Sequence, residues 1–153
     1  MMADRTEPVT LTNMCMVQKD GKVLVLDRTD PAWPGLTFPG GHVEPGEPVN
    51  MSVVREIKEE TGLKITPPRL CGLKQFNDAQ NRRYIVFCYI AKVQSGKLRE
   101  SAEGRLTWMT LEELKQRPLA EGFAGMLNIF CDEELTEYFV HYGADGERQE
   151  AVY

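Results

Sequence analysis

The sequence has little that points to a membrane or to secretion. Its longest apolar-rich run, residues 84–93, is far too short to cross a bilayer, because a membrane helix needs about 20 apolar residues. The N-terminal residues 1–8 lack the apolar core of a secretory signal. We therefore expect a cytoplasmic protein that does not bind membranes.

Cysteine pairs and internal repeats are also missing. The four cysteines are widely separated, with no C-x-x-C pair and no metal-finger spacing. They are Cys15, Cys71, Cys88 and Cys131. We expect them to be reduced and mostly buried, because a free cysteine packs like a small hydrophobic residue. Without repeats or low-complexity tracts, the chain is predicted to form a single domain over residues 1–153, in which the role of the tail from about residue 133 is open.

The chain also lacks an excess of positive charge. It has 18 Lys and Arg residues against 23 Asp and Glu residues, which gives a net charge of −5. Duplex DNA and long RNA are bound through many Lys and Arg contacts to phosphates, so this balance argues against such a partner. A free nucleotide is still compatible with it, since metal ions and one or two local cations can neutralise a small anion.

What the sequence does contain is a series of apolar segments separated by Gly, Pro and Asp turns. We predict strands at residues 9–18, 23–27, 36–38, 69–76, 84–93 and 105–109. We predict helices at residues 48–61, from residue 110 onward and at residues 122–130. Two structures are open for residues 133–153, namely a terminal hairpin or a frayed end.

The most informative segment lies between Gly41 and Leu63. It follows the pattern G-x5-E-x7-R-E-U-x-E-E-x-G-U, where U is a bulky aliphatic residue, and all nine specified positions match. At a background of roughly 5–7% for each fixed residue, a chance match in a chain of this length is well below about one in a million. The segment is therefore strong support for a specific chemistry.

The glutamates of this segment share one side of the predicted helix. At 100° per residue, Glu56, Glu59 and Glu60 fall within one arc, beside an apolar stripe that packs. Glu56 and Glu60 should repel one another by a few tenths of a kcal/mol, and a hard cation such as Mg²⁺ would remove that repulsion. For an isolated acidic helix, a solvated face with an Arg55–Glu59 ion pair is the better explanation. The flanking Gly40, Gly41, Glu47 and Gly62 favour the metal site instead.

This spacing is typical of the Nudix hydrolases, which the chain resembles. Between about residues 9 and 114 it also resembles the MutT-like branch of nucleoside triphosphate pyrophosphohydrolases, some of which clear 8-oxo-dGTP. The residues that support this are Leu11-Thr-Asn-Met14, Phe38-Pro-Gly-Gly41 and Glu103-Gly104. The resemblance implies an α/β fold, a Nudix-type α/β/α sandwich with a mixed β-sheet.

The resemblance also implies a reaction and its metal ligands. A metal-activated water attacks one phosphorus of a nucleoside diphosphate linked to another group, with Mg²⁺ as cofactor and Mn²⁺ as a substitute. It makes Glu59 and Glu60 the best metal ligands, Glu56 a ligand or the base, and the Gly40 carbonyl a further ligand. Glu103 either acts at the metal or as base, or is an ordinary solvated loop residue.

The remaining motif residues are implied to support this site. The arginine that matches Arg55 orients a glutamate by hydrogen bonding, and the glutamate that matches Glu47 braces the loop. Gly41 and Gly62 are structural, since glycine allows tight turns and close approach of the backbone to a ligand.

Five residues outside the motif are candidates for substrate binding, and each has an alternative role. Asn13 either reads a purine edge with its amide or bonds to neighbouring backbone. Trp33 and Phe38 either stack on a base or serve as lid or core residues. Arg28 and Lys74 either meet phosphate or are surface charges.

Three functions remain open at this stage. The first is hydrolysis of a nucleoside triphosphate, with 8-oxo-dGTP as one candidate, to the monophosphate and pyrophosphate. The second is hydrolysis of ADP-ribose or another nucleoside diphosphate derivative, and His42, which replaces a lysine common in MutT relatives, weakens the first choice. The third is a catalytically silent Nudix module that binds nucleotide. Sequence does not decide between a monomer and a homodimer.

Overall fold

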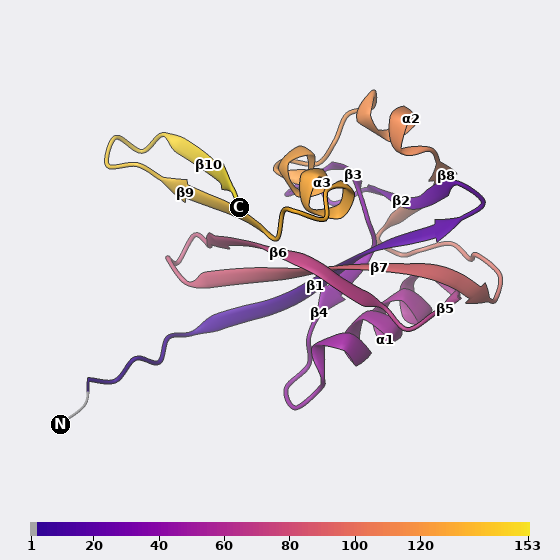
Figure 1. The fold of residues 1–153 in the computed structure, drawn as a ribbon, viewed down its shortest axis with the longest axis horizontal. Helices are drawn as coiled ribbons and strands as arrows, with labels where there is room; N and C mark the ends of the chain where they lie inside the picture. Colours follow the sequence, from indigo (N-terminus) through magenta and orange to yellow (C-terminus); the bar gives the residue numbers. More distant parts are fainter. Residues whose placement is uncertain (1–2) are drawn as a thin grey trace.

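The computed structural model describes residues 3–153 and shows a mixed β-sheet between helices (Figure 1). The strands are β1 (Val9–Lys19), β2 (Lys22–Arg28), β3 (Gly35–Thr37), β4 (Gly40–His42), β5 (Lys64–Ile65), β6 (Arg69–Asn77), β7 (Arg83–Ser95), β8 (Gly104–Met109), β9 (Glu137–Tyr142) and β10 (Arg148–Val152). The helices are α1 (Val49–Thr61), α2 (Leu111–Lys115) and α3 (Phe123–Cys131). Among residues 3–153, no helix has the length and apolar character needed to cross a membrane.

The long strand β1 organises the sheet. The strand order is β10-β9-β6-β7-β1-β2-β3, with β4 paired to β1, β5 to β7 and β8 to β2. The pairs β1–β7 and β6–β9 are parallel, whereas the other strand pairs are antiparallel. On the side of β1 away from β7, β4 pairs with residues 12–14 and β2 with residues 18–19. The short strand β4 therefore lies beside the first half of β1.

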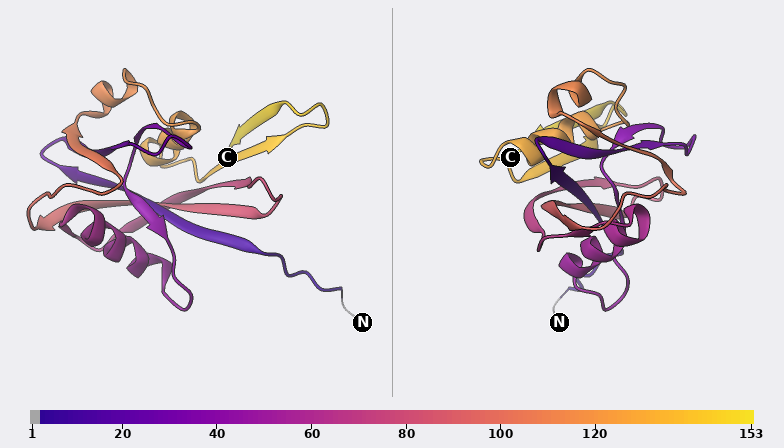
Figure 2. Two further views of the ribbon diagram at one scale, coloured as in Figure 1. Left: turned by 180° about the vertical axis from the view of Figure 1, so that it is seen from behind. Right: turned by 90° about the vertical axis from the view of Figure 1, so that its right-hand side faces the viewer.

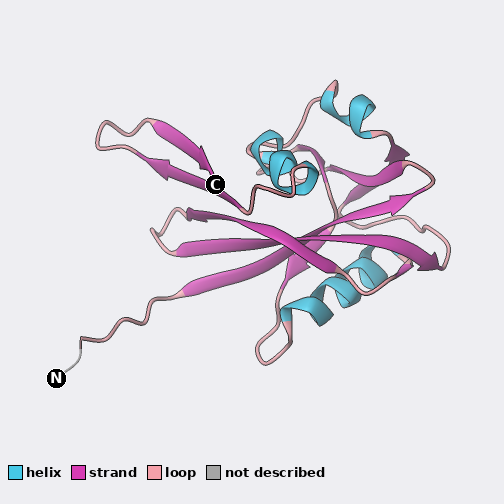
Figure 3. Cartoon of the chain, in the orientation of Figure 1, coloured by secondary structure: helices cyan, strands magenta, loops and turns pink. Residues whose placement is uncertain are grey.

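Successive residues of β1 point to opposite faces of the sheet and so pack into two cores. Cys15 and Val17 belong to the core beneath α1, with Val53 and Ile57 of that helix. Met14 and Met16 belong to the second core, which includes most of α3. The views in Figure 2 and the cartoon in Figure 3 show α1 on one side of the sheet and α2 and α3 on the other. The predicted α/β sandwich with a mixed sheet is confirmed.

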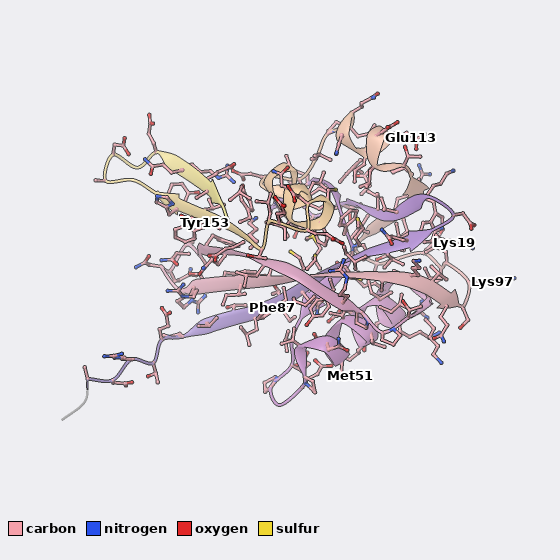
Figure 4. The ribbon with its side chains drawn as sticks, in the orientation of Figure 1. Lys19, Met51, Phe87, Lys97, Glu113 and Tyr153 are labelled. Atoms are coloured by element: carbon pink, nitrogen blue, oxygen red, sulfur yellow. The ribbon has the colours of Figure 1, made fainter. Side chains whose placement is uncertain are left out.

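Helix α1 begins and ends where its sequence indicates. Pro48 is the N-cap, and Gly62 is the C-cap with φ of 78°, a left-handed conformation that glycine adopts without strain. The Gly62 N–H donates to the Lys58 carbonyl. Met51 is exposed on the side of α1 away from the sheet (Figure 4), whereas Val53 and Ile57 are buried. The motif glutamates are thus carried on a helix whose position is fixed at both ends and along one side.

The C-terminal residues form the hairpin that was one of the two alternatives. Strands β9 and β10 are antiparallel, and β9 runs parallel to β6, with Lys74 paired to Tyr138. This hairpin extends the sheet on the side that also carries α3 (Figure 1). Two short strands, β4 and β5, were missing from the sequence prediction, because neither has an alternating apolar pattern.

The cysteines only partly follow the expectation. All four are free thiols, and Cys15 and Cys88 are buried. Cys71 is half-buried and Cys131 is exposed on α3, so burial is less complete than predicted.

Candidate active site

The backbone of Gly40 and Gly41 lies between β1 and α1. Gly40 pairs with Met14 and Gly41 with Asn13. A Cβ on Gly40 would lie 2.1 Å from the Asn13 carbonyl oxygen, and a Cβ on Gly41 would lie 2.4 Å from the carboxyl carbon of Glu56. Only glycine allows this approach, which places β4 directly against the motif helix.

Arg55 connects the carboxylates around β4. Its Nε and Nη2 donate to the two oxygens of Glu47, at 2.7 and 3.0 Å. Its Nη1 donates to Glu56 Oε1 at 2.8 Å and to Glu59 Oε2 at 3.1 Å, and Nη2 also donates to the His42 carbonyl at 3.0 Å. Arg55 therefore joins the loop before the helix, strand β4 and two motif glutamates. Its hydrogen bonds to Glu47 hold the pKa of that carboxyl at about 2.

The three motif glutamates differ in environment. The Glu59 side chain is 60% exposed and bonds to Arg55, whereas the Glu56 side chain is 14% exposed and uses one oxygen for Arg55. Both oxygens of Glu60 are buried and have no hydrogen-bond partner in residues 3–153. The Glu59 carboxylate is directed to Arg55 and not toward Glu60. Its role as a metal ligand stays a prediction.

Burial raises the pKa of Glu60 well above its usual range, and the neighbouring carboxylates of Glu103 and Glu56 raise it further. The backbone amide of Gly40 acts in the opposite direction. Residues that are far apart in the chain, from β4, α1 and the turn before β8, are thus gathered around one carboxylate. Glu103 lies beside this carboxylate while its side chain stays 50% exposed, so its role at the metal stays a prediction.

This group fits a divalent cation. Buried carboxylate oxygens without partners, beside two further carboxylates, form a site that a positive charge would stabilise. Within residues 3–153, no three or more Asp, Glu, His or Cys side chains stand close enough together to hold a metal ion by themselves. Small hard cations usually keep several waters and bind through one or two carboxylates plus substrate oxygens, so an incomplete cage is consistent with such an ion. Glu60, Glu103, Glu56 and the Gly40 carbonyl are the groups that could hold it.

A cavity of about 540 Å³ lies on the face of the sheet opposite α1. Gly40, Gly41 and Glu103 lie in its wall, together with Lys74 and Arg148 from the C-terminal half of the chain. Its volume is within the range of pockets that bind small molecules, about 300–1,000 Å³. The cluster of the Glu56, Glu60 and Glu103 carboxylates therefore lies next to a nucleotide-sized cavity.

Four of the five predicted substrate residues line this cavity. They are Arg28, Trp33, Phe38 and Lys74. Arg28 lies 3.9 Å from a Glu103 oxygen and stacks 4.8 Å from the Trp33 ring, so it is not a free surface charge. Phe38 is a core residue, 1% exposed and in edge-to-face contact with Phe123 and Phe130. Lys74 is buried, which corrects its alternative description as a surface charge.

Asn13 is the exception, and the structure contradicts its proposed contact with a base. It is 3% exposed, its Nδ2 donates to Ser52 Oγ at 2.8 Å, and its Oδ1 accepts from the Gly41 N–H at 3.4 Å. Because β1 alternates, Asn13 faces α1 together with Cys15, whereas Thr12 and Met14 face the cavity. Asn13 therefore holds β4 to the helix and does not reach a ligand in the cavity.

Some cavity residues were not identified from the sequence. Tyr142 and Arg148 reach the cavity from the C-terminal hairpin, and Asp78 reaches it from the turn after β6. The tail contains an Asp145-Gly146 turn between two short polar and aromatic runs, which indicates a hairpin. Nothing in those runs indicates that the hairpin pairs with β6.

Replacing Gly41 with Ala should reduce activity much more than stability. The new Cβ would overlap the Glu56 carboxylate, which lies at the end of a flexible side chain and can move aside. We expect kcat to fall about 10- to 100-fold, because Glu56 would leave its Arg55 bond, while the melting temperature changes by only a few degrees. Gly143→Ala is the matched control for thermal unfolding and kinetics, since Gly143 has no positive φ, lies outside the cavity lining, and a Cβ there would meet only the side-chain ends of Asp145 and Gln149. Full activity in Gly41→Ala would contradict the placement of Glu56.

Comparisons with known proteins agree with this description. A family model described as NUDIX domain matches residues 9–129. The chain is 35% identical over 119 residues to the uncharacterized Nudix hydrolase YvcI of Bacillus subtilis, with 74% of each chain covered. It is 31% identical over 119 residues to a CTP pyrophosphohydrolase of Escherichia coli, covering 75% of this chain and 86% of that one.

Two further similarities bear on substrate and on fold. The chain is 36% identical over 92 residues to an ADP-ribose pyrophosphatase of Methanocaldococcus jannaschii, covering 59% of this chain and 54% of that one. A crystal structure of a MutT protein from Bacillus halodurans superposes with a TM-score of 0.76 and 27% identity, covering 94% of this chain and 97% of that one. The similarity to that structure thus extends over nearly the whole chain, including residues beyond the family model.

Proposed function

This chain belongs to the NUDIX domain family, whose members are hydrolases of phosphorus-containing anhydrides, and on that basis we propose a specific reaction for it. The protein is a Mg²⁺-dependent hydrolase that converts a nucleoside triphosphate into the monophosphate and pyrophosphate. The observation that supports this most directly is the buried Glu60 carboxylate beside Glu103 and Glu56, of which Glu103 also lies in the wall of a nucleotide-sized cavity.

The roles of the residues follow from their environments. Glu60, Glu103 and the Gly40 carbonyl would hold the cation, with Glu56 near them. When bound, Mg²⁺ offsets the charge of the phosphates and lowers the pKa of a water molecule. Glu56 bonds to Arg55 through Oε1 only, so its Oε2 is available to accept the proton of the attacking water. The new O–P bond replaces the P–O bond between the α and β phosphates, and the leaving group is pyrophosphate if the α phosphorus is attacked or the nucleoside monophosphate if the β phosphorus is attacked.

Arg55 is a positioning residue in this scheme. It contacts Glu56 and the loop that contains Glu47, and so fixes the direction of the Glu56 carboxylate relative to β4. Arg28 has a comparable position beside Glu103 and also stacks on Trp33, which links the turn before β8 to the loop at residues 29–34. Arg55 therefore fixes two motif glutamates by hydrogen bonds, whereas Arg28 lies within ion-pair distance of Glu103.

The choice of a triphosphate is supported by the CTP pyrophosphohydrolase and MutT similarities, which extend over most of both chains. 8-oxo-dGTP is one candidate, in line with the MutT-like residues. The ADP-ribose pyrophosphatase similarity favours ADP-ribose as a second candidate, although it covers only about half of that relative. A catalytically silent nucleotide-binding module is disfavoured, because every carboxylate of the motif is present.

A substrate panel tests the proposal. We expect turnover of at least one triphosphate among the common ribo- and deoxyribonucleotides and 8-oxo-dGTP, with Mg²⁺ or Mn²⁺ but not with EDTA, to the monophosphate and pyrophosphate. Ion-exchange chromatography identifies the products, and reaction in ¹⁸O-labelled water shows which phosphorus is attacked. Release of orthophosphate alone would contradict the proposed cleavage. A kcat/KM on ADP-ribose equal to the best triphosphate would move ADP-ribose to first place.

A further inference from the structure

Lys74 is a buried cation that the reaction scheme does not use. It lies on β6, is 8% exposed and lines the cavity. Among the described residues, its Nζ has no hydrogen-bond acceptor and no carboxylate within ion-pair distance; it lies 5.1 Å from the centre of the Phe76 ring and 5.7 Å from that of Tyr138. Its Nζ is not fully buried, so water or a ligand in the cavity supplies the oxygen that this ammonium group needs.

The surroundings of Lys74 make its charge unfavourable in the free protein. Burial lowers the pKa of Lys74, and the nearby Arg148 lowers it further. The two aromatic faces offset only part of the loss of hydration. A ligand that supplies an acceptor would therefore gain a desolvated hydrogen bond that is stronger than the same bond in water.

The register of the sheet places Lys74 far from the cluster of the Glu56, Glu60 and Glu103 carboxylates. His42 pairs with Thr12, Thr12 with Val86, and Val86 with Lys74, in one row across β4, β1, β7 and β6. Three strand spacings separate His42 from Lys74, which is about 14 Å. When the phosphates of a substrate lie beside Gly40 and Glu103, Lys74 is at the end where the nucleobase lies. With the phosphates in that place, Lys74 would meet the nucleobase and not a phosphate.

The charges around Lys74 favour a neutral oxygen over an anion. Arg148 from β10 donates through Nη2 to the Tyr138 hydroxyl at 3.2 Å, and its Nη1 pairs with Glu150. Glu121 also lines the cavity. Two cations are thus opposed by two carboxylates, and the local net charge is close to zero. A second phosphate would find little attraction there, whereas a carbonyl oxygen needs only a donor.

We propose that Lys74 selects the nucleobase by donating to a ring carbonyl oxygen. Guanine and hypoxanthine carry a carbonyl at the position where adenine carries an amino group, and uracil differs from cytosine in the same way. Lys offers only donors, so an amino group facing it would leave both groups unpaired. The inference rests on the proposed function, because it assumes that the substrate phosphates lie beside the Glu56, Glu60 and Glu103 carboxylates.

The test uses pairs of nucleotides that carry either a carbonyl or an amino group at the same ring position. For the wild-type protein, we expect kcat/KM to be about 10- to 100-fold higher for ITP than for ATP, and for UTP than for CTP. Lys74→Met keeps the length of the side chain and removes the donor, so each ratio should fall to within about threefold of one. Lys64→Met is the control; Lys64 is exposed on β5, outside the cavity, and both ratios should be unchanged.

Binding separates this inference from the proposed function. The affinities of non-hydrolysable α,β-methylene analogues of GTP and ATP, measured by calorimetry with Mg²⁺, should show the same carbonyl preference and its loss in Lys74→Met. Preferential binding without turnover would contradict the proposed function and support the role of Lys74. A preference for CTP or ATP, an unchanged ratio in Lys74→Met, or no binding of either analogue would overturn the inference. Thermal unfolding should show Lys74→Met to be at least as stable as wild type, because an unpaired buried charge is removed.

Discussion

Glu60→Gln should lower kcat by about 10³-fold while leaving the metal-free protein folded with a melting temperature within a few degrees of wild type. Without a cation, burial favours the neutral form of this carboxyl, and glutamine has nearly the same shape as that form. With a divalent cation, however, the amide cannot replace an ionised oxygen ligand. We therefore also expect Mg²⁺ to raise the melting temperature of wild type but not of the variant, as measured by scanning calorimetry.

Two comparison variants make this result specific to Glu60. Glu133→Gln removes an exposed glutamate just after α3 and should leave kcat and the Mg²⁺ effect unchanged. Glu59→Gln should reduce kcat less than Glu60→Gln does, because the exposed Glu59 carboxylate bonds to Arg55. Equal losses in the two variants would show that Glu59 leaves Arg55 and joins the cation site. A Glu60→Gln variant with wild-type turnover would remove Glu60 from the mechanism.

The elements that could be predicted from the sequence are those determined by local residues. Helix α1 is bounded by Pro48 and Gly62, whose conformational preferences act within one turn. The main strands have apolar runs of sufficient length, and the motif spacing indicates which carboxylates belong together. These features depend on neighbours in the chain and so are visible without a structure.

The different environments of the three motif glutamates could not be predicted in the same way. A helix places Glu56, Glu59 and Glu60 within one arc, yet Glu59 and Glu60 still point 100° apart. Which of these two carboxylates is buried depends on where β4 and Glu103 lie. The surroundings of the Asn13 side chain could not be predicted from the sequence either. On an alternating strand Asn13 shares a face with Cys15 and Val17, but only the packing of α1 shows that this face is opposite the cavity.

The end of the cavity at Lys74 depends on contacts that are distant in sequence. Lys74 on β6 meets Tyr138 on β9 through a parallel strand pair, and parallel pairs need long connections that carry no local signal. Arg148 is brought to the same place by the hairpin turn. The burial of a lysine therefore follows from the arrangement of three strands and not from its neighbours in the chain.

Arg55→Ala is the second change for which we expect a large effect, because one side chain makes five hydrogen bonds to four residues. Its removal leaves the Glu47 and Glu56 carboxylates without their partner, and hydrogen bonds to charged groups contribute about 1.5–3 kcal/mol each. Since Arg55 is 28% exposed and water replaces part of these bonds, we expect the free energy of unfolding to fall by about 2–3 kcal/mol. Turnover should fall at least 10- to 100-fold as Glu56 loses its orientation.

Urea unfolding between pH 7 and pH 3 tests the electrostatic part of this expectation. Arg55 lowers the pKa of Glu47 from its ordinary value of 4.5 to about 2, so Glu47 contributes stability that is present above pH 4.5 and is lost as the pH falls toward 2. In Arg55→Ala only the smaller contribution of the Glu44 backbone N–H is left, so stability should decrease less steeply below pH 4.5 than in wild type. Arg55→Lys keeps the charge but not the planar fork, so it should restore part of the acid dependence but little of the turnover. If the acid dependence were the same in wild type and Arg55→Ala, the ion pair with Glu47 would not form in solution, and the orientation of Glu56 would need another cause.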